Sequence, residues 1–232
     1  MAKKTTTNQR AYGTTVLERL AGEALPAALK GPAKGFKEAH ANVEKASKAT
    51  EAARAVRDAA LEAVASADAA LDVSVEALAD GLVGAGLGSR KAPLASFTRR
   101  TVSELVSLAY ATEAKEVRAL CAAVRRAKPP APVTKALATC EKNLQHVERA
   151  IAAIAKPQAT YAKALASRDA LLPAWTRAIG RLKRHAAVAW EDDLATIRAT
   201  FAPPDDIATP KPKRRKPKAV IVTNGGPPGL AV

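Results

Sequence analysis

The densest group of residues with an obvious binding chemistry lies near the C-terminus. Residues 211–218 read KPKRRKPK and hold six of the 37 basic residues, with no acidic residue among them. Basic side chains on an extended, proline-stiffened chain contact phosphates without reading bases, so we expect non-specific, salt-sensitive contact with a polyanion. A nuclear-import signal and a merely solvating charge run are the alternatives. The candidate polyanion-binding residues are Lys211, Lys213, Arg214, Arg215, Lys216 and Lys218.

A short apolar patch with high β-propensity follows the basic run. It could add a strand to the exposed sheet edge of a protein partner, because extended peptides bind in this way. The alternative is a chance apolar cluster in a disordered end. The candidate docking residues are Ala219, Val220, Ile221, Val222 and Thr223.

The two cysteines have a predictable geometry. Cys121 and Cys140 are equidistant from the midpoint of the PPAP turn at 129–132, so an antiparallel hairpin would place them side by side. A redox pair or half of a soft-metal site is one interpretation; two small buried residues is the other, favoured because CxxC and a neighbouring His are both missing. Two cysteines form no disulfide framework, so we expect a reducing compartment and a cytoplasmic location.

Catalytic patterns are missing from the sequence. His40, His146 and His185 are scattered, and no Glu-x-x-His motif supports a carboxylate-bridged metal bundle. The chain has no G-x-S-x-G nucleophile elbow. The glycine cluster at 84–89, GAGLGS, lacks the Gly-Lys-Ser/Thr ending of a phosphate loop and is typical of an interhelical turn. We therefore predict no enzyme activity, no cofactor and no metal site.

The positive charge extends beyond the tail. The whole chain carries +15. Removal of the residues from Pro203 onward, with six basic and two acidic side chains, would leave 15 − 6 + 2 = +11. A basic body indicates polyanionic partners such as nucleic acid, an acidic protein or an anionic surface. No apolar run is long enough for a transmembrane helix.

The composition predicts that the body of the chain is helical. Aromatic residues make up only 3% of the chain, and its abundant alanine favours helices over sheets. We expect a disordered N-terminus over 1–13, a short helix from Thr14 or Thr15, and a long helix from about Gly35 to Leu82. The apolar seam of this long helix is Phe36, Val43, Leu61, Val64, Leu71, Val75, Leu78 and Leu82, with Asp68 in a skipped position.

Two further helices are predicted beyond a glycine-rich loop at 81–93. One runs from Pro93 or Ser103 to Lys128, with Glu113 on its periodic face. The next has a 4–3 heptad that keeps its phase through Pro157 and Pro173, which indicates a kinked continuous helix. A second seam at 190–201, offset by one residue, would be its drifting continuation. The 4–3 heptad of the helix that contains Pro157 and Pro173 is uninterrupted over Val133, Leu137, Cys140, Leu144, Val147, Ile151 and Ile154.

The expected fold is all-α, an elongated antiparallel helical bundle or coiled coil of four to five helices. The bundle spans 14–202, and the tail at 203–232, rich in Pro, Lys and Arg, is disordered. The preferred hypothesis is a non-enzymatic structural or adaptor protein, a self-associating scaffold whose basic arm contacts a polyanion or a partner protein. A non-specific nucleoid-type DNA-binding protein is the alternative. The alanine-rich bundle with a Lys/Pro tail is also similar in composition to bacterial phasins and linker-histone-like proteins, so a phasin-like granule-surface protein is the second alternative.

Overall fold

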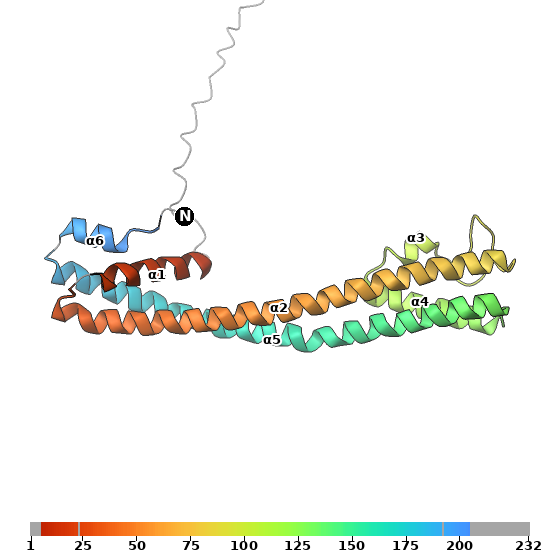
Figure 1. Cartoon of the computed structure of the whole chain (residues 1–232), viewed down its shortest axis with the longest axis horizontal. Coiled ribbons are helices and arrows are strands. Elements are labelled where there is room, and N and C mark those ends of the chain that lie inside the picture. The colour runs from red at the N-terminus through yellow and green to blue at the C-terminus, as the bar shows by residue number, and fades with distance from the viewer. Residues whose placement is uncertain (1–5, 23, 192, 205–232) are drawn as a thin grey trace, which may run out of the picture.

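The computed structural model describes residues 6–22, 24–191 and 193–204 (Figure 1). Outside its helices, this part of the chain forms only an isolated bridge between Ser89 and Ala92. The all-α prediction is confirmed for the described residues. Their helices are α1 (Thr6–Ala21), α2 (Ala27–Gly84), α3 (Val102–Leu105), α4 (Tyr110–Arg126), α5 (Ala131–Ala189) and α6 (Leu194–Phe201).

Two long helices run the length of the molecule. α2 has 58 residues and α5 has 59, so each is about 85–90 Å long at 1.5 Å per residue. They lie antiparallel, with the N-terminal half of α2 beside the C-terminal half of α5 (Figure 1). α1 and α6 cover one end of this pair, and α3 and α4 cover the other (Figure 1).

One hydrophobic core fills the end that carries α3 and α4; we name it the α4-end core. The α5 residues in it follow the predicted spacing of four and three, which places them on one face of the helix. Their partners come from the C-terminal half of α2 and from α4. The main members are Leu71, Val75, Leu78, Leu82, Leu105, Val117, Leu120, Val124, Val133, Leu137, Cys140, Leu144 and Val147.

A second core, the α1-end core, fills the opposite end. The rings of Phe36 and Trp175 meet edge to face with centroids 5.7 Å apart. The Tyr12 hydroxyl donates a hydrogen bond to the Phe201 carbonyl over 3.1 Å, which ties α1 to α6. The core residues are Val16, Leu20, Leu29, Phe36, Val43, Trp175, Ile179, Leu182, Ala186 and Phe201.

Between the two cores only α2 and α5 face each other. None of residues 51–63 of α2 or 148–174 of α5 is buried, and we name these two segments the waist. Leu61, predicted on the apolar seam, is 43% exposed here, because no third helix covers it. Ile151 and Ile154 are only half-buried.

The phase argument for the two internal prolines is confirmed. α5 continues through Pro157 and Pro173 without interruption. Each proline removes one backbone hydrogen bond. The backbone hydrogen bonds of the neighbouring turns keep α5 helical on both sides of each proline. The seam therefore resumes in register at Trp175 and Ile179.

The N-terminal prediction is corrected for part of its range. α1 begins at Thr6, well before the predicted start at Thr14 or Thr15. Tertiary contacts explain the difference, because the polar side chains of this segment have partners on other helices. Arg10 forms ion pairs with Glu44 and Glu51 of α2. Residues 1–5 lie outside the described residues.

Two other helix boundaries differ from the prediction. α2 already begins at Ala27, so Pro32 lies inside it; burial of Leu29 and Phe36 on the same face holds this first part of the helix against the core. The predicted third helix is broken after α3. The Thr101 side chain and Glu104 form a capping box at the start of α3, and α4 starts anew at Tyr110.

The predicted continuation of α5 through 190–201 is also corrected. α5 ends at Ala189, and the Asp193 carboxylate starts α6 by accepting hydrogen bonds from the backbone N–H groups of Ala195 and Thr196. The chain turns back at Glu191, which has a positive φ of 50°. None of the described helices combines the length and the apolarity that crossing a membrane requires.

Candidate functional site

The tail residues predicted to bind partners lie outside the described residues. This applies to the polyanion-binding set Lys211, Lys213, Arg214, Arg215, Lys216 and Lys218. It applies equally to the docking set Ala219, Val220, Ile221, Val222 and Thr223. Both remain predictions. The last described residues follow α6, at the end of the molecule that holds the α1-end core.

The structure brings the two cysteines together as predicted. The Sγ atoms of Cys121 and Cys140 lie 3.7 Å apart, and both side chains are buried in the α4-end core. The hydrogen bond to Cys140, together with burial, raises the pKa of the Cys121 thiol. A protonated, buried thiol is a poor nucleophile and a poor metal ligand. The geometry therefore agrees with the interpretation of two small core residues.

The three histidines stay apart, and His40 has a packing role. The Trp175 indole N–H donates to His40 Nδ1 over 3.2 Å, and Thr14 Oγ1 lies 3.2 Å from His40 Nε2. Burial lowers the pKa of His40, so the neutral ring joins α1, α2 and α5. His185 lines a groove on the surface at the same end of the molecule.

This groove lies between the N-terminal part of α2 and the C-terminal part of α5. It has a volume of about 980 Å³ and is open to solvent. Gly31 and Gly35 line the α2 side of the groove. A Cβ added to either would meet no atom within 4 Å, so this side is open. Its other lining residues are Pro32, Phe36, Ala174, Thr176, Arg177, Ala178, Gly180, Arg181, Arg184 and His185.

Three arginines give the groove its chemistry. Arg177, Arg181 and Arg184 are exposed, and none forms an ion pair with a carboxylate of the described residues. They follow the spacing i, i+4, i+7 and so share one face of α5. No acidic residue occurs between Ala170 and Trp190 of the sequence. The guanidinium groups are therefore free to bind phosphate or carboxylate groups bidentately.

Two arginines at the opposite end of the molecule form ion pairs between helices. Arg118 pairs with Glu148 and Arg125 pairs with Glu141, both between α4 and α5. The contrast indicates that the groove arginines are not there to join helices. We name Arg177, Arg181 and Arg184 the groove arginines.

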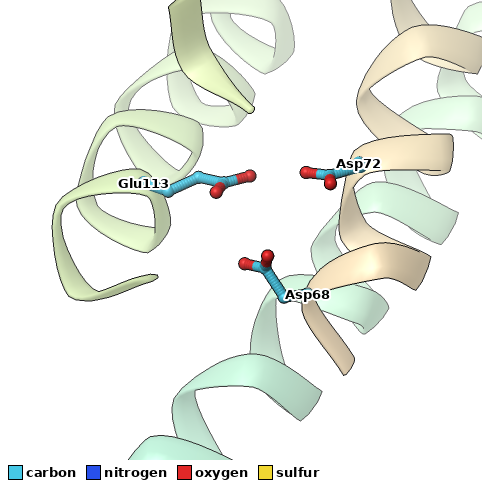
Figure 2. A group of neighbouring side chains, drawn as sticks. All are labelled: Asp68, Asp72 and Glu113. Carbon is cyan, nitrogen blue, oxygen red and sulfur yellow. The ribbon is translucent and has the colours of Figure 1, made fainter. Parts of the chain in front are cut away.

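A second cluster lies beside the α4-end core and is acidic. Asp68 and Asp72 are one helical turn apart on α2, and Glu113 belongs to the first turn of α4. One carboxylate oxygen from each residue lies within 4.8 Å of the others. Figure 2 shows the three carboxylates pointing toward one another across the gap between the helices. We name these residues the carboxylate cluster.

Burial makes this cluster electrostatically unfavourable. Glu113 is 0% exposed, and neither of its carboxylate oxygens has a hydrogen-bond partner. Burial, with the adjacent Asp72 and Asp68, raises the pKa of Glu113 to about 8. Burial and the charge of Asp72 also raise the pKa of Asp68. Like charges brought together out of water are costly unless a proton or a cation neutralises them.

Sequence reasoning missed both sites although each left a signal. Glu113 occupied a position on the apolar seam of its helix, and Asp68 occupied a skipped seam position, with Asp72 four residues later. A carboxylate on a seam needs a neutralising partner, but the sequence did not show that α2 and α4 meet. The groove arginines were visible as an acid-free stretch, yet their lack of ion pairs required the fold.

Comparisons with known proteins add no family to this description. No protein-family model, no curated protein and no solved structure matches the chain.

Proposed function

We propose that the chain is a non-enzymatic structural or adaptor protein that contacts a polyanion. In this proposal it is an elongated antiparallel bundle with coiled-coil packing, it associates with further copies of itself, and it holds the basic arm at one end. The observation that carries the proposal is the groove between α2 and α5 with its three unpaired arginines. Three unpaired cations on one helical face beside a groove form a positive patch that attracts anionic groups.

The groove arginines form a positive stretch along α5. Arg177 and Arg184 are seven residues apart, so the groove arginines span about 10 Å along α5. Lys30, Lys34 and Lys37 of α2 are exposed, lie within two positions of Gly31 or Gly35 in the sequence, and add further positive charge. Release of counterions from several phosphates would then drive the association.

The basic arm starts at the same end of the molecule as the groove. Phe201 of α6 packs in the α1-end core, and the groove lies between the parts of α2 and α5 that also contribute to this core. Lys211 is seven positions after Pro204, and a fully extended segment of this length reaches at most about 25 Å. In this proposal the arm and the groove contact one polyanion together.

The groove also bears on the choice of polyanion. A nucleoid-type DNA-binding protein would contact phosphate with its body as well as its arm, whereas a scaffold would need only the arm. The groove arginines belong to the body and are unpaired, which supports duplex DNA bound through its backbone. A phasin-like role would require a continuous apolar surface, whereas the large exposed apolar residues of the described part are dispersed over several helices.

Self-association is supported by the waist. Two helices alone cannot bury a full seam, and Leu61, Ile151 and Ile154 stay partly accessible there. A second copy packed against this segment would bury them in a four-helix arrangement. The waist is therefore the proposed contact between copies, and the basic end stays free for the polyanion.

Binding to a random-sequence duplex of about 30 base pairs at roughly 50 mM salt, followed by fluorescence anisotropy, tests the proposal. The full chain is compared with a chain ending at Ala202 and with the groove variant R177Q/R181Q/R184Q. A matched control, R90Q/K91Q/R99Q, removes the same charge from exposed positions at the other end. We expect the groove variant to weaken binding at least about tenfold and the control to weaken it about twofold. Equal losses in the two variants, or no binding by the full chain, would contradict the proposal.

A further inference from the structure

We propose that the carboxylate cluster of Asp68, Asp72 and Glu113 binds one divalent cation with a preference for oxygen ligands: Mg²⁺, Ca²⁺ or Mn²⁺. The site lies at the opposite end of the molecule from the groove. It is therefore independent of the proposed polyanion contact.

The unpaired oxygens of the cluster indicate a missing partner. Both oxygens of Glu113 and one oxygen each of Asp68 and Asp72 are buried without a hydrogen bond. No Lys, Arg or His of the described residues forms an ion pair with any of the three. Native proteins rarely leave buried polar atoms unsatisfied, because each one costs free energy. Glu113, fully buried and aimed at the two aspartates, is the clearest case (Figure 2).

A cation satisfies the cluster better than a proton does. One proton on Glu113 would cover a single oxygen and leave two aspartates side by side on α2. A divalent cation would accept an oxygen from each of the three carboxylates at once. Ligand oxygens on one ion with bonds of about 2.1–2.5 Å lie up to about 5 Å apart. The 4.8 Å limit on the three oxygens therefore allows a common ion.

The ligand types decide the class of cation. Carboxylate oxygen is the only donor in the cluster, and hard cations prefer such ligands, whereas Zn²⁺ and other borderline or soft ions favour His and Cys. Cys121 donates its hydrogen bond to Cys140, and neither cysteine belongs to the carboxylate cluster. Asp68 and Asp72 are half-buried rather than buried, so water has access to the remaining coordination positions.

The cation would connect two helices that otherwise repel each other at this point. Glu113 lies in the first turn of α4, which packs mainly on α5, and the two aspartates belong to α2. The segment between α2 and α4 contains the loop at 85–101 and the short helix α3. Bound metal would hold the start of α4 against α2 and thereby fix this segment.

A titration of the full chain with Mn²⁺ after EDTA treatment tests the proposal, with the free Mn²⁺ measured by its EPR signal. The variants are Asp72→Asn and Glu113→Gln, which relieve charge and so preserve the fold. Glu76→Gln is the matched control, because Glu76 is exposed one turn beyond Asp72 on α2. Competition by Mg²⁺ and Ca²⁺ then ranks the ions, and melting followed by circular dichroism gives a second measurement.

We expect one Mn²⁺ per chain and a melting temperature that rises with cation concentration. Affinity should fall at least about tenfold in both ligand variants and stay unchanged in the control. Absence of saturable one-to-one binding would overturn the proposal and leave the cluster as a shared proton site. Equal affinities in Asp72→Asn, Glu113→Gln and Glu76→Gln would also overturn it, because the ion would then bind elsewhere.

Discussion

Replacement of Glu113 by Gln has a predictable effect on how stability depends on pH in the metal-free chain. Burial beside Asp72 and Asp68 raises the pKa of Glu113 from an ordinary 4.5 to about 8. The folded chain therefore holds this proton more tightly than the unfolded chain does. Stability should fall as the pH rises from about 4.5 to about 8, the range in which only the unfolded chain releases the proton.

The size of this effect follows from the pKa shift. One pKa unit corresponds to about 1.4 kcal/mol, so a carboxyl that titrated alone would cost the folded chain about 5 kcal/mol of stability over this range. The three carboxyls titrate as a unit, and we therefore expect a loss of roughly 2–4 kcal/mol between pH 5 and pH 9. The Gln variant has no charge to develop at this position and keeps the shape of the side chain. It should match the wild type near pH 5 and exceed its stability by roughly the same amount at pH 9.

Urea unfolding in EDTA, followed by circular dichroism at several pH values, measures the difference. Titrating groups outside the carboxylate cluster contribute equally to the two proteins and cancel in the comparison. Glu76→Gln serves as the control and should follow the wild-type profile, because Glu76 is exposed. Parallel profiles for the wild type and the Glu113→Gln variant would refute the reasoning, since they would show that Glu113 ionises normally in the folded chain.

Three further predictions concern other parts of the molecule. Gly13→Ala would place a Cβ 2.4 Å from His40 Nδ1, so it should lower the free energy of unfolding by about 1–3 kcal/mol; unchanged urea denaturation would mean that α1 does not pack as described. Cys121 and Cys140 are buried, so they should react with a thiol reagent such as DTNB only after unfolding in urea, and rapid labelling of the native chain would argue against this burial. Leu61→Glu should lower the mass measured by sedimentation equilibrium if the waist joins two copies, and a wild-type chain that stays monomeric would contradict that contact.

Periodicity in the sequence predicted the long helices well because their seams are local patterns repeated many times. The heptad of α5 kept its phase across Pro157 and Pro173, and a loop would have had no reason to preserve it. The two cysteines could be paired for a related reason, since only the turn between their helices had to be identified. The N-terminal residues 6–13 gave no such signal, because Arg10 and Tyr12 are held in α1 by partners far along the chain.

Neither candidate site could be derived from local pattern. The carboxylate cluster depends on the contact of α2 with the start of α4, which a loop of unknown path separates in the sequence. Whether Arg177 or Arg181 forms an ion pair depends on which Asp and Glu side chains the fold brings near it. The hydropathy pattern does not predict this. Seam positions occupied by carboxylates, such as Glu113, remain the best sequence signal for a buried polar site of this kind.

The salt dependence of duplex binding tests the central claim most directly. Each phosphate contact contributes about 0.9 to the slope of log K against log salt concentration. Loss of the groove arginines should therefore lower the magnitude of the slope by roughly 2–3, whereas the control R90Q/K91Q/R99Q should leave it near the value of the full chain. Identical slopes for the full chain and the groove variant would show that Arg177, Arg181 and Arg184 do not contact phosphate, and the proposed role of the groove would be wrong.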